Sequence, residues 1–152
     1  MDILEFLKEA KINTYANENI EKKNPSRVGS NDYEYSNNGL TYHDTYFGGR
    51  KFMGEEIVYK DETPIWGMNY YGVTLDEELS EEAMDKALRP ALMQVGQDGI
   101  IPVRGPREFS NEEYKYTFEV TGNIEYFTGI ETIYKNDEII YVLRCTGGSI
   151  LK

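Results

Sequence analysis

Several features on which many proteins depend are scarce in this sequence. Its 152 residues include one cysteine, Cys145, and one histidine, His43. A single cysteine excludes an intramolecular disulfide, and a lone histidine without a cysteine cluster is a poor basis for a metal site. We therefore expect no bound metal. The apolar strand pattern around Cys145 favours a buried, inert thiol over a nucleophile.

Long apolar runs are absent too. No stretch approaches the eighteen or so residues that a membrane-spanning helix needs, and the N-terminus MDILEFLKEAK has neither a basic leader nor a cleavage site. These features predict a cytoplasmic protein that does not interact with membranes.

Basic residues are outnumbered. There are 16 Lys and Arg against 27 Asp and Glu, which gives a net charge of -11. Such a chain repels a phosphate backbone, so we expect no direct nucleic-acid binding, although Arg104, Arg107 and Lys115 lie fairly close in sequence. The excess of acid is typical of a solvated surface, and an acidic DNA mimic is a lesser alternative.

Sequence motifs of the common enzymes are missing as well. The chain has no Gly-x-Ser-x-Gly, no phosphate-binding loop and no dinucleotide fingerprint, so we expect no cofactor. His43-x-x-x-Tyr-x-Gly-Gly is at best a weak indication of catalysis.

The most informative feature present is a stretch that occurs twice. Residues 52–72 align without a gap on residues 127–147, seventy-five positions later. The identical pairs are Phe52/Phe127, Gly54/Gly129, Glu56/Glu131, Tyr59/Tyr134, Lys60/Lys135, Ile65/Ile140 and Gly72/Gly147. We interpret the similarity as an internal repeat.

Hydrophobic periodicity predicts two helices. Apolar residues at helical spacing predict one over about residues 2–15 with Asp2 as its cap, and an apolar stripe predicts another from Ser80 to Gly96. Pro90 lies inside the second helix, where we expect a kink or a break. Residues 17–32 are polar and predict a connecting loop.

Alternating segments predict the strands. Asn37-Asn38-Gly39 predicts a tight hairpin turn, and residues 61–62 and 136–137 predict two more. The first half then contains four strands and the second three, with a possible short strand around residues 100–103. We predict a single α+β domain over residues 1–152: an antiparallel sheet of about seven strands with two main helices, and duplicated halves 1–74 and 75–152.

The duplicated hairpins place one glutamate each among apolar neighbours. Turns centred on residues 61–62 and 136–137 would pair Val58 with Ile65, and Ile133 with Ile140. Period two then puts Glu56 and Glu131 on the apolar face, where a pair of carboxylates can act in acid/base chemistry or grip a ligand. In the alternative, bulges at the preceding glycines turn the acids outward, or Arg144 forms a plain salt bridge with Glu131.

Trp66, Tyr70 and Tyr71 form the other notable group. Aromatic side chains with polar tips suit the walls of a small-molecule pocket, but they suit a hydrophobic core equally well.

Three tracts together resemble an uncharacterised bacterial domain family. They are FLKEAKINTYA, TYHDTYFGGRKFMGEEIVYKDETPIWGMNYYG and EYFTGIETIYKNDEIIYVLRCTGGSI. The family is similar to this chain over nearly its whole length, and it occurs alone or C-terminal to helix-turn-helix regulators of the XRE type. The resemblance implies an effector or partner domain and assigns no catalytic residue. This chain departs from the longer arrangement because only about thirty residues precede its sheet.

We therefore predict a noncatalytic domain that binds a small-molecule ligand or a regulator protein. Its expected ligand-binding residues are Arg50, Glu56, Trp66, Tyr70, Tyr71, Glu131 and Arg144. One alternative is a small hydrolase or transferase that uses Glu56 or Glu131 as general base, with or without His43. Another is a purely structural or interaction protein. The sequence leaves the ligand and the oligomeric state open.

Overall fold

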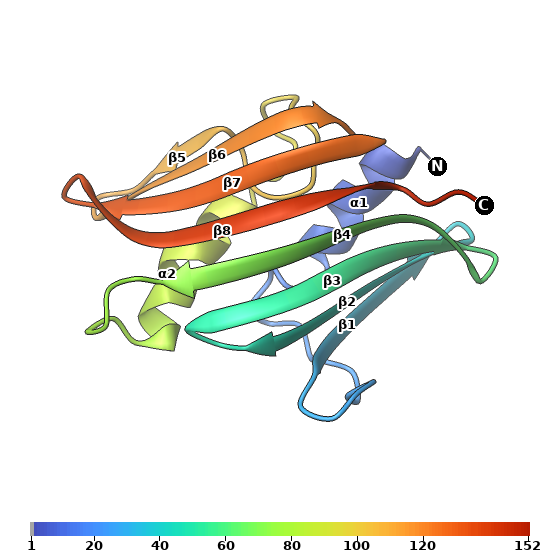
Figure 1. Cartoon of the computed structure of the whole chain (residues 1–152), viewed down its shortest axis with the longest axis horizontal. Helices are drawn as coiled ribbons and strands as arrows, with labels where there is room; N and C mark the ends of the chain where they lie inside the picture. The colour runs from blue at the N-terminus through green and yellow to red at the C-terminus, as the bar shows by residue number, and fades with distance from the viewer. Residues whose placement is uncertain (1) are drawn as a thin grey trace.

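The fold is a single antiparallel sheet with helices on one face. The computed structural model describes residues 2–152, and within them eight strands form one sheet in the order β1-β2-β3-β4-β8-β7-β6-β5. Figure 1 shows both helices behind the sheet and the two termini near the same end. The α+β class is confirmed, with eight strands in place of the expected seven.

Each helix is followed along the chain by a run of four strands. The first run comprises α1 (Ile3–Ile12), β1 (Asn31–Asn37), β2 (Leu40–Gly48), β3 (Lys51–Lys60) and β4 (Thr63–Thr74). The second comprises α2 (Glu81–Leu92), β5 (Glu108–Ser110), β6 (Tyr114–Asn123), β7 (Tyr126–Lys135) and β8 (Glu138–Ser149). The two runs meet where β4 pairs with β8.

The helices begin where their caps predict. The Asp2 carboxylate accepts from the Leu4 amide, and the Ser80 hydroxyl accepts from the Ala83 amide. These contacts satisfy backbone donors that the first turn of a helix leaves free. Both helices are shorter than expected, and α2 includes Pro90 and ends two residues later at Leu92.

The three predicted hairpin turns are confirmed. Asn38 and Gly39 join β1 to β2, and both have positive φ. The pairs 61–62 and 136–137 also have positive φ at both positions, as a two-residue turn with the right twist requires. Asn, Asp and Gly adopt this conformation more readily than other residues.

The predicted pairing within the β3–β4 and β7–β8 hairpins is wrong by one residue. A bulge between Val58 and Tyr59 pairs Val58 with Trp66, and a matching bulge after Ile133 pairs it with Tyr141. Because side chains alternate between faces, this shift turns Trp66 and Tyr141 into the core.

The additional strand is β5. It pairs through three residues with β6, at the edge of the sheet. The stretch around residues 100–103, where a short strand was possible, instead forms turns that pack Ile100 and Val103 into the core. A strand of three residues carries too little periodicity to be read from sequence.

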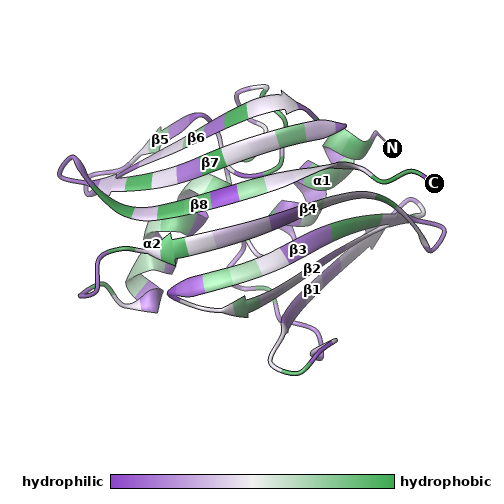
Figure 2. Cartoon of the chain, in the orientation of Figure 1, coloured by the Kyte–Doolittle hydropathy of each residue, from purple (hydrophilic) through white to green (hydrophobic). Residues whose placement is uncertain are grey.

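The core lies between the helices and one face of the sheet. Phe6 and Leu7 of α1, and Met84 and Ala87 of α2, are buried against inward-facing strand residues. The opposite face stays open to solvent at its centre, where Met53, Tyr71 and Arg144 are exposed. Figure 2 shows hydrophobic and hydrophilic bands following one another along β7 and β8, which is typical of a sheet with one wet face. No helix among residues 2–152 is both long and apolar enough to cross a membrane.

Hydrogen bonds to a buried aspartate stabilise the loop between α1 and β1. The Asp32 carboxylate accepts hydrogen bonds from the hydroxyls of Ser26, Ser30 and Thr45, and lies 2.7 Å from His43 Nε2. Burial acts against its ionisation, but the hydrogen bonds from these hydroxyls hold the pKa of Asp32 well below its usual range. His43 therefore takes part in a structural cluster.

Candidate ligand-binding site

Glu131 lies on the helix-facing side of β7 and is fully buried. The guanidinium of Arg104 donates to both of its oxygens, at 2.9 and 2.6 Å. The hydroxyls of Tyr116 and Tyr141 add bonds of 2.5 and 2.8 Å. Burial opposes the charge of Arg104, yet the neighbouring Glu131 raises the pKa of Arg104 well above its ordinary value. Four donors thus hold one carboxylate in place.

Glu56 occupies the matching position on β3 but has fewer partners. Its Oε1 lies 2.5 Å from Lys11 Nζ, and both side chains are fully buried. Its Oε2 has no hydrogen-bond partner among residues 2–152, and neither has the nearby Tyr42 hydroxyl. Burial lowers the pKa of Lys11, and the charge of Glu56 opposes that effect.

Asp44 lies beside Glu56 on the neighbouring strand. The two residues are paired between β2 and β3, and Asp44 is 2% exposed. Its Oδ1 accepts a 2.6 Å hydrogen bond from the Tyr70 hydroxyl. Burial raises the pKa of Asp44 to about 8, and the charge of Glu56 adds to the rise. Asp44 therefore holds a proton near neutral pH more readily than an ordinary aspartate.

The ring of Tyr15 connects the two ion pairs. Lys11 Nζ lies 5.4 Å from its centroid, and the Arg104 guanidinium lies 5.3 Å from it. Arg104 is also 5.9 Å from the ring of Tyr70. These are cation–π distances, so the aromatic side chains help to hold both buried cations.

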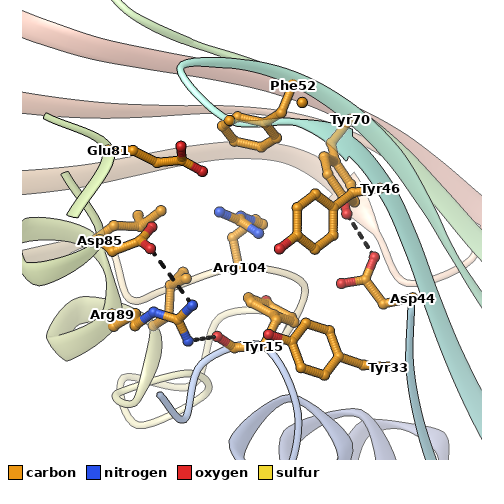
Figure 3. A pocket seen from close by; sticks show the side chains of 14 residues that line it. Tyr15, Tyr33, Asp44, Tyr46, Phe52, Tyr70, Glu81, Asp85, Arg89 and Arg104 are labelled. Carbon is orange, nitrogen blue, oxygen red and sulfur yellow. Dashed lines mark hydrogen bonds and ion pairs between the residues drawn. The ribbon is translucent and has the colours of Figure 1, made fainter. Parts of the chain in front are cut away.

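A cavity of about 100 Å³ lies between the sheet and α2, next to this cluster. Asp44, Tyr70 and Arg104 are among its buried lining residues, whereas Glu81 and Asp85 of α2 are exposed. Figure 3 shows these side chains converging from the sheet, from α2 and, for Arg104, from the irregular segment after α2. The remaining lining residues are Tyr15, Tyr33, Tyr46, Gly48, Gly49, Phe52, Leu88, Arg89 and Leu92. The volume is several times what a single water molecule needs.

Two glycines leave room for side chains that line this cavity. At Gly49, an added Cβ would lie 2.5 Å from a carboxylate oxygen of Glu81, so a larger residue would make that exposed side chain shift. At Gly54, an added Cβ would lie 2.5 Å from the Tyr70 hydroxyl, which needs that space to reach Asp44. The glycine therefore makes room for Tyr70 and does not form the bulge considered as an alternative.

The structure brings few of the predicted ligand-binding residues together. Tyr70 lines the cavity, whereas Glu56 and Glu131 are buried in the adjoining cluster and do not line it. Trp66 is in the core, where its indole donates to the Ile124 carbonyl and its ring stacks on Phe127.

The other three predicted residues lie elsewhere. Arg50 donates to the carbonyls of Asp76 and Leu79 and so holds the segment before α2. Tyr71 and Arg144 line a broader hollow on the open face of the sheet. The salt bridge considered between Arg144 and Glu131 is wrong, because Glu131 is buried on the opposite face and pairs with Arg104.

Three important residues were not anticipated. Asp44 alternates with Leu40 and Tyr42 on one face of β2, so its period could have placed it in the core. Lys11 follows Leu7 by four residues on the apolar stripe of α1, so its spacing could likewise have predicted burial. Arg104 lies in an irregular segment, where no periodicity indicates burial.

The arrangement of the acidic, histidine and cysteine side chains determines whether a metal ion could be held. Nowhere in residues 2–152 do three or more His, Cys, Asp or Glu side chains gather in an arrangement suited to a metal ion. The buried acids instead have lysine, arginine and tyrosine as neighbours, which stabilise a carboxylate without a metal.

The fold and cavity define an α+β domain with a polar, aromatic space between α2 and one antiparallel sheet. The chain belongs to the family described as Domain of unknown function (DUF5680), which matches residues 44–150. No curated protein matches the chain, and no solved structure does. The matched region contains Asp44, Tyr70 and both buried glutamates.

Proposed function

We propose that this protein is a noncatalytic ligand-binding domain that takes a small molecule into the cavity beside α2. The observation that carries the proposal is the buried Asp44–Tyr70 pair on the wall of an aromatic-lined space. Ligand sites usually combine apolar and aromatic walls with a few fixed polar groups. The cavity beside α2 has that composition.

The hollow on the open face is a weaker candidate. It is larger, at about 610 Å³, but Tyr71, Arg144 and Glu119 on its walls are exposed to solvent. Polar groups that already contact water give little selectivity, because a ligand must compete with that water. The buried carboxyl of Asp44 is therefore the better recognition group.

The geometry favours binding over catalysis by the glutamates. A general base must lie within hydrogen-bond reach of the substrate proton that it removes. Glu131 already accepts four hydrogen bonds, and neither it nor Glu56 lines the cavity. A hydrolase or transferase built on either residue would require the ion-pair cluster to open.

We also propose that the domain serves as an effector module for a bacterial transcription regulator. Its support is the resemblance to domains found C-terminal to XRE-type helix-turn-helix regulators. The net charge of -11 is consistent with a module that leaves DNA contact to another part of the assembly. In this proposal the protein partner reads the DNA, and this domain responds to the ligand.

An internal repeat is part of the same proposal. Tyr70 pairs with Cys145 across β4 and β8, and these residues are seventy-five positions apart. The pairs on either side, Trp66 with Ser149 and Thr74 with Tyr141, fit an approximate twofold axis at this point. Matching bulges in the β3–β4 and β7–β8 hairpins also support it.

A thermal-shift screen tests the binding proposal. Small amines, carboxylates and neutral aromatic compounds are added to wild type, to Leu88→Trp, which fills the cavity, and to Leu75→Trp, which adds the same ring at an exposed site. We expect at least one compound to raise the Tm of wild type and Leu75→Trp by about 2 °C or more, but not that of Leu88→Trp. Circular dichroism confirms that both variants fold. No stabilisation by any compound, or an unchanged response in Leu88→Trp, would overturn the proposal.

A further inference from the structure

The acidic and basic groups around the α2 cavity are not paired one to one. Arg104 is neutralised by Glu131, and Arg89 donates to the Tyr15 carbonyl at 2.6 Å and lies 3.8 Å from Asp85. That leaves Asp44 and Glu81, neither of which has a cation within ion-pair distance among residues 2–152. The cavity therefore has an excess of acid.

The rings around it suit a positive charge. Tyr15, Tyr46, Phe52 and Tyr70 line the cavity, and the faces of aromatic rings attract cations. The protein already uses this interaction nearby, because Lys11 and Arg104 both lie over the ring of Tyr15. A ligand cation would meet the same kind of surroundings on the cavity side.

One oxygen of Asp44 is available to such a ligand. Oδ1 accepts from Tyr70, while no hydrogen bond to Oδ2 is formed within residues 2–152. Figure 3 shows that second oxygen pointing away from Tyr70, toward the space between the labelled side chains. A nearly buried carboxyl with a free oxygen aimed into an aromatic cavity is a specific feature, unlike an acidic surface.

We propose that the cavity binds a small organic ammonium ion, whose charge pairs with the carboxylate of Asp44 among the rings of Tyr46, Phe52 and Tyr70. This inference rests on the proposed ligand-binding function and names its ligand class. The volume of about 100 Å³ limits the buried part to a small amine or the ammonium end of a longer molecule. The net charge of -11 favours the approach of cations and disfavours anions.

Binding of an ammonium ion releases a proton. Burial and Glu56 raise the pKa of Asp44 to about 8, so the carboxyl is mostly protonated at pH 7. An ammonium ligand keeps its own protons and pairs with the carboxylate form, and the displaced Asp44 proton passes to solvent. The groups that face Asp44 are Glu56 on β3, Tyr70 on β4, Lys11 on α1 and Arg104, with Glu81 and Asp85 of α2 on the same cavity.

A matched ligand series tests the charge. The probes are n-butylammonium, n-butanol and butyrate, which differ mainly in charge, and each is titrated by NMR chemical shifts of cavity residues at pH 8. We expect n-butylammonium to bind at least about tenfold more tightly than either of the others, as for an ion pair with a buried carboxylate. Its affinity should rise about tenfold from pH 6 to pH 7 and level off above pH 8.

Two variants identify the acid responsible. Asp44→Asn keeps an acceptor for Tyr70 and removes the charge, so it should lose about tenfold or more in n-butylammonium affinity and its pH dependence. Asp85→Asn removes an exposed acid from the same cavity and should change affinity by less than about threefold. The affinity of n-butanol should be unchanged in both variants, which shows that the cavity is intact.

The outcomes separate this inference from the function on which it rests. Tighter binding of butyrate or n-butanol in the cavity would overturn the ammonium proposal and leave the ligand-binding function standing. Equal loss in Asp44→Asn and Asp85→Asn would overturn the role of Asp44. If neither these probes nor the screened compounds perturb the cavity, both proposals fail.

Discussion

Glu56 and Glu131 occupy matching places in the two halves of the sheet, but their surroundings differ. Glu131 receives four hydrogen bonds, two of them from a bidentate arginine. Glu56 receives one from Lys11, and its other oxygen has no partner within the described residues 2–152. Where Phe118 lies beside Glu131, Asp44 lies beside Glu56. In one half, donors from the protein satisfy the buried carboxylate of Glu131. In the other half, the two neighbouring acids Glu56 and Asp44 lie next to a cavity.

The comparison distinguishes a buried carboxylate whose hydrogen bonds are complete from one that keeps an unsatisfied oxygen. A carboxylate whose lone pairs are all used can hold the fold together, but it has nothing left for a ligand. In the Glu56 half, the aspartate in place of a phenylalanine adds a second acid that burial keeps protonated. The contrast predicts that Glu131 variants affect stability most, and that Asp44 variants affect pH dependence and binding.

The largest expected effect is from Glu131→Gln. This change leaves Arg104 buried without a countercharge, and arginine cannot lose its proton to compensate. We expect a loss of about 3–5 kcal/mol in the free energy of unfolding. Urea denaturation followed by tryptophan fluorescence measures it, because Trp66 is buried in the core.

Glu56→Gln is the matched comparison. It leaves Lys11 without a partner, but burial already lowers the pKa of Lys11, so the amine can become neutral. The expected loss is about 1–3 kcal/mol, smaller than that of Glu131→Gln. Equal losses in the two variants would contradict the distinction between the halves.

The second prediction concerns pH. Asp44 keeps its proton up to about pH 8 in the folded protein, whereas an unfolded aspartate loses it near pH 3.9. Between these values the folded state binds more protons, so the stability that Asp44 contributes is present at low pH and lost as pH rises through 8. Asp44→Asn cannot titrate, so its stability relative to wild type should rise by up to about 1.4 kcal/mol per pH unit in this window.

Urea midpoints at pH 5, 6, 7 and 8 measure this difference. Glu113→Gln removes an exposed carboxylate and serves as the control for the change in net charge. Its stability relative to wild type should stay nearly constant over the same range. A flat difference for Asp44→Asn as well would show that Asp44 is ionised in the folded protein, and would remove the proton release expected on ammonium binding.

Much of the fold could be predicted because its signals are local. Asp2 and Ser80 cap helices through contacts within three residues, and the turn at Asn38-Gly39 follows from backbone preferences. The bulge after Val58 was not predictable in this way, since nothing in the residue types marks where an extra residue enters a ladder. This bulge has a large effect, because it determines on which face of the sheet the Trp66 side chain lies.

The candidate site was predicted less well because it depends on long-range partners. The alternation of side chains along a strand correctly predicted that Glu56 and Glu131 lie on the buried face. Which cation meets each one depends on how α1 and the segment after α2 pack on the sheet, and the sequence does not determine that. Arg104 reaches Glu131 from an irregular segment, while Arg144, closer in sequence, points to solvent.

The smallest expected effect comes from one member of a pair of tyrosines at matching positions. Tyr116 pairs with Ile133 on β7, and Tyr42 pairs with Val58 on β3. The Tyr116 hydroxyl donates to Glu131 and accepts from the Gly105 amide, so Tyr116→Phe leaves two buried groups with fewer partners. We expect a loss of about 1–3 kcal/mol in the free energy of unfolding, measured by urea denaturation.

Tyr42→Phe removes a buried hydroxyl that has no hydrogen-bond partner in the part of the chain that the structure describes, and it keeps the ring that lies 5.6 Å from Lys11 Nζ. Nothing is left unsatisfied by the change, so we expect stability to stay within about 0.5 kcal/mol of wild type or to rise slightly. A loss as large as that of Tyr116→Phe would mean that the Tyr42 hydroxyl has a partner in solution. The free oxygen of Glu56 is the acceptor it would reach, and the two halves would then be more alike than their hydrogen bonds indicate.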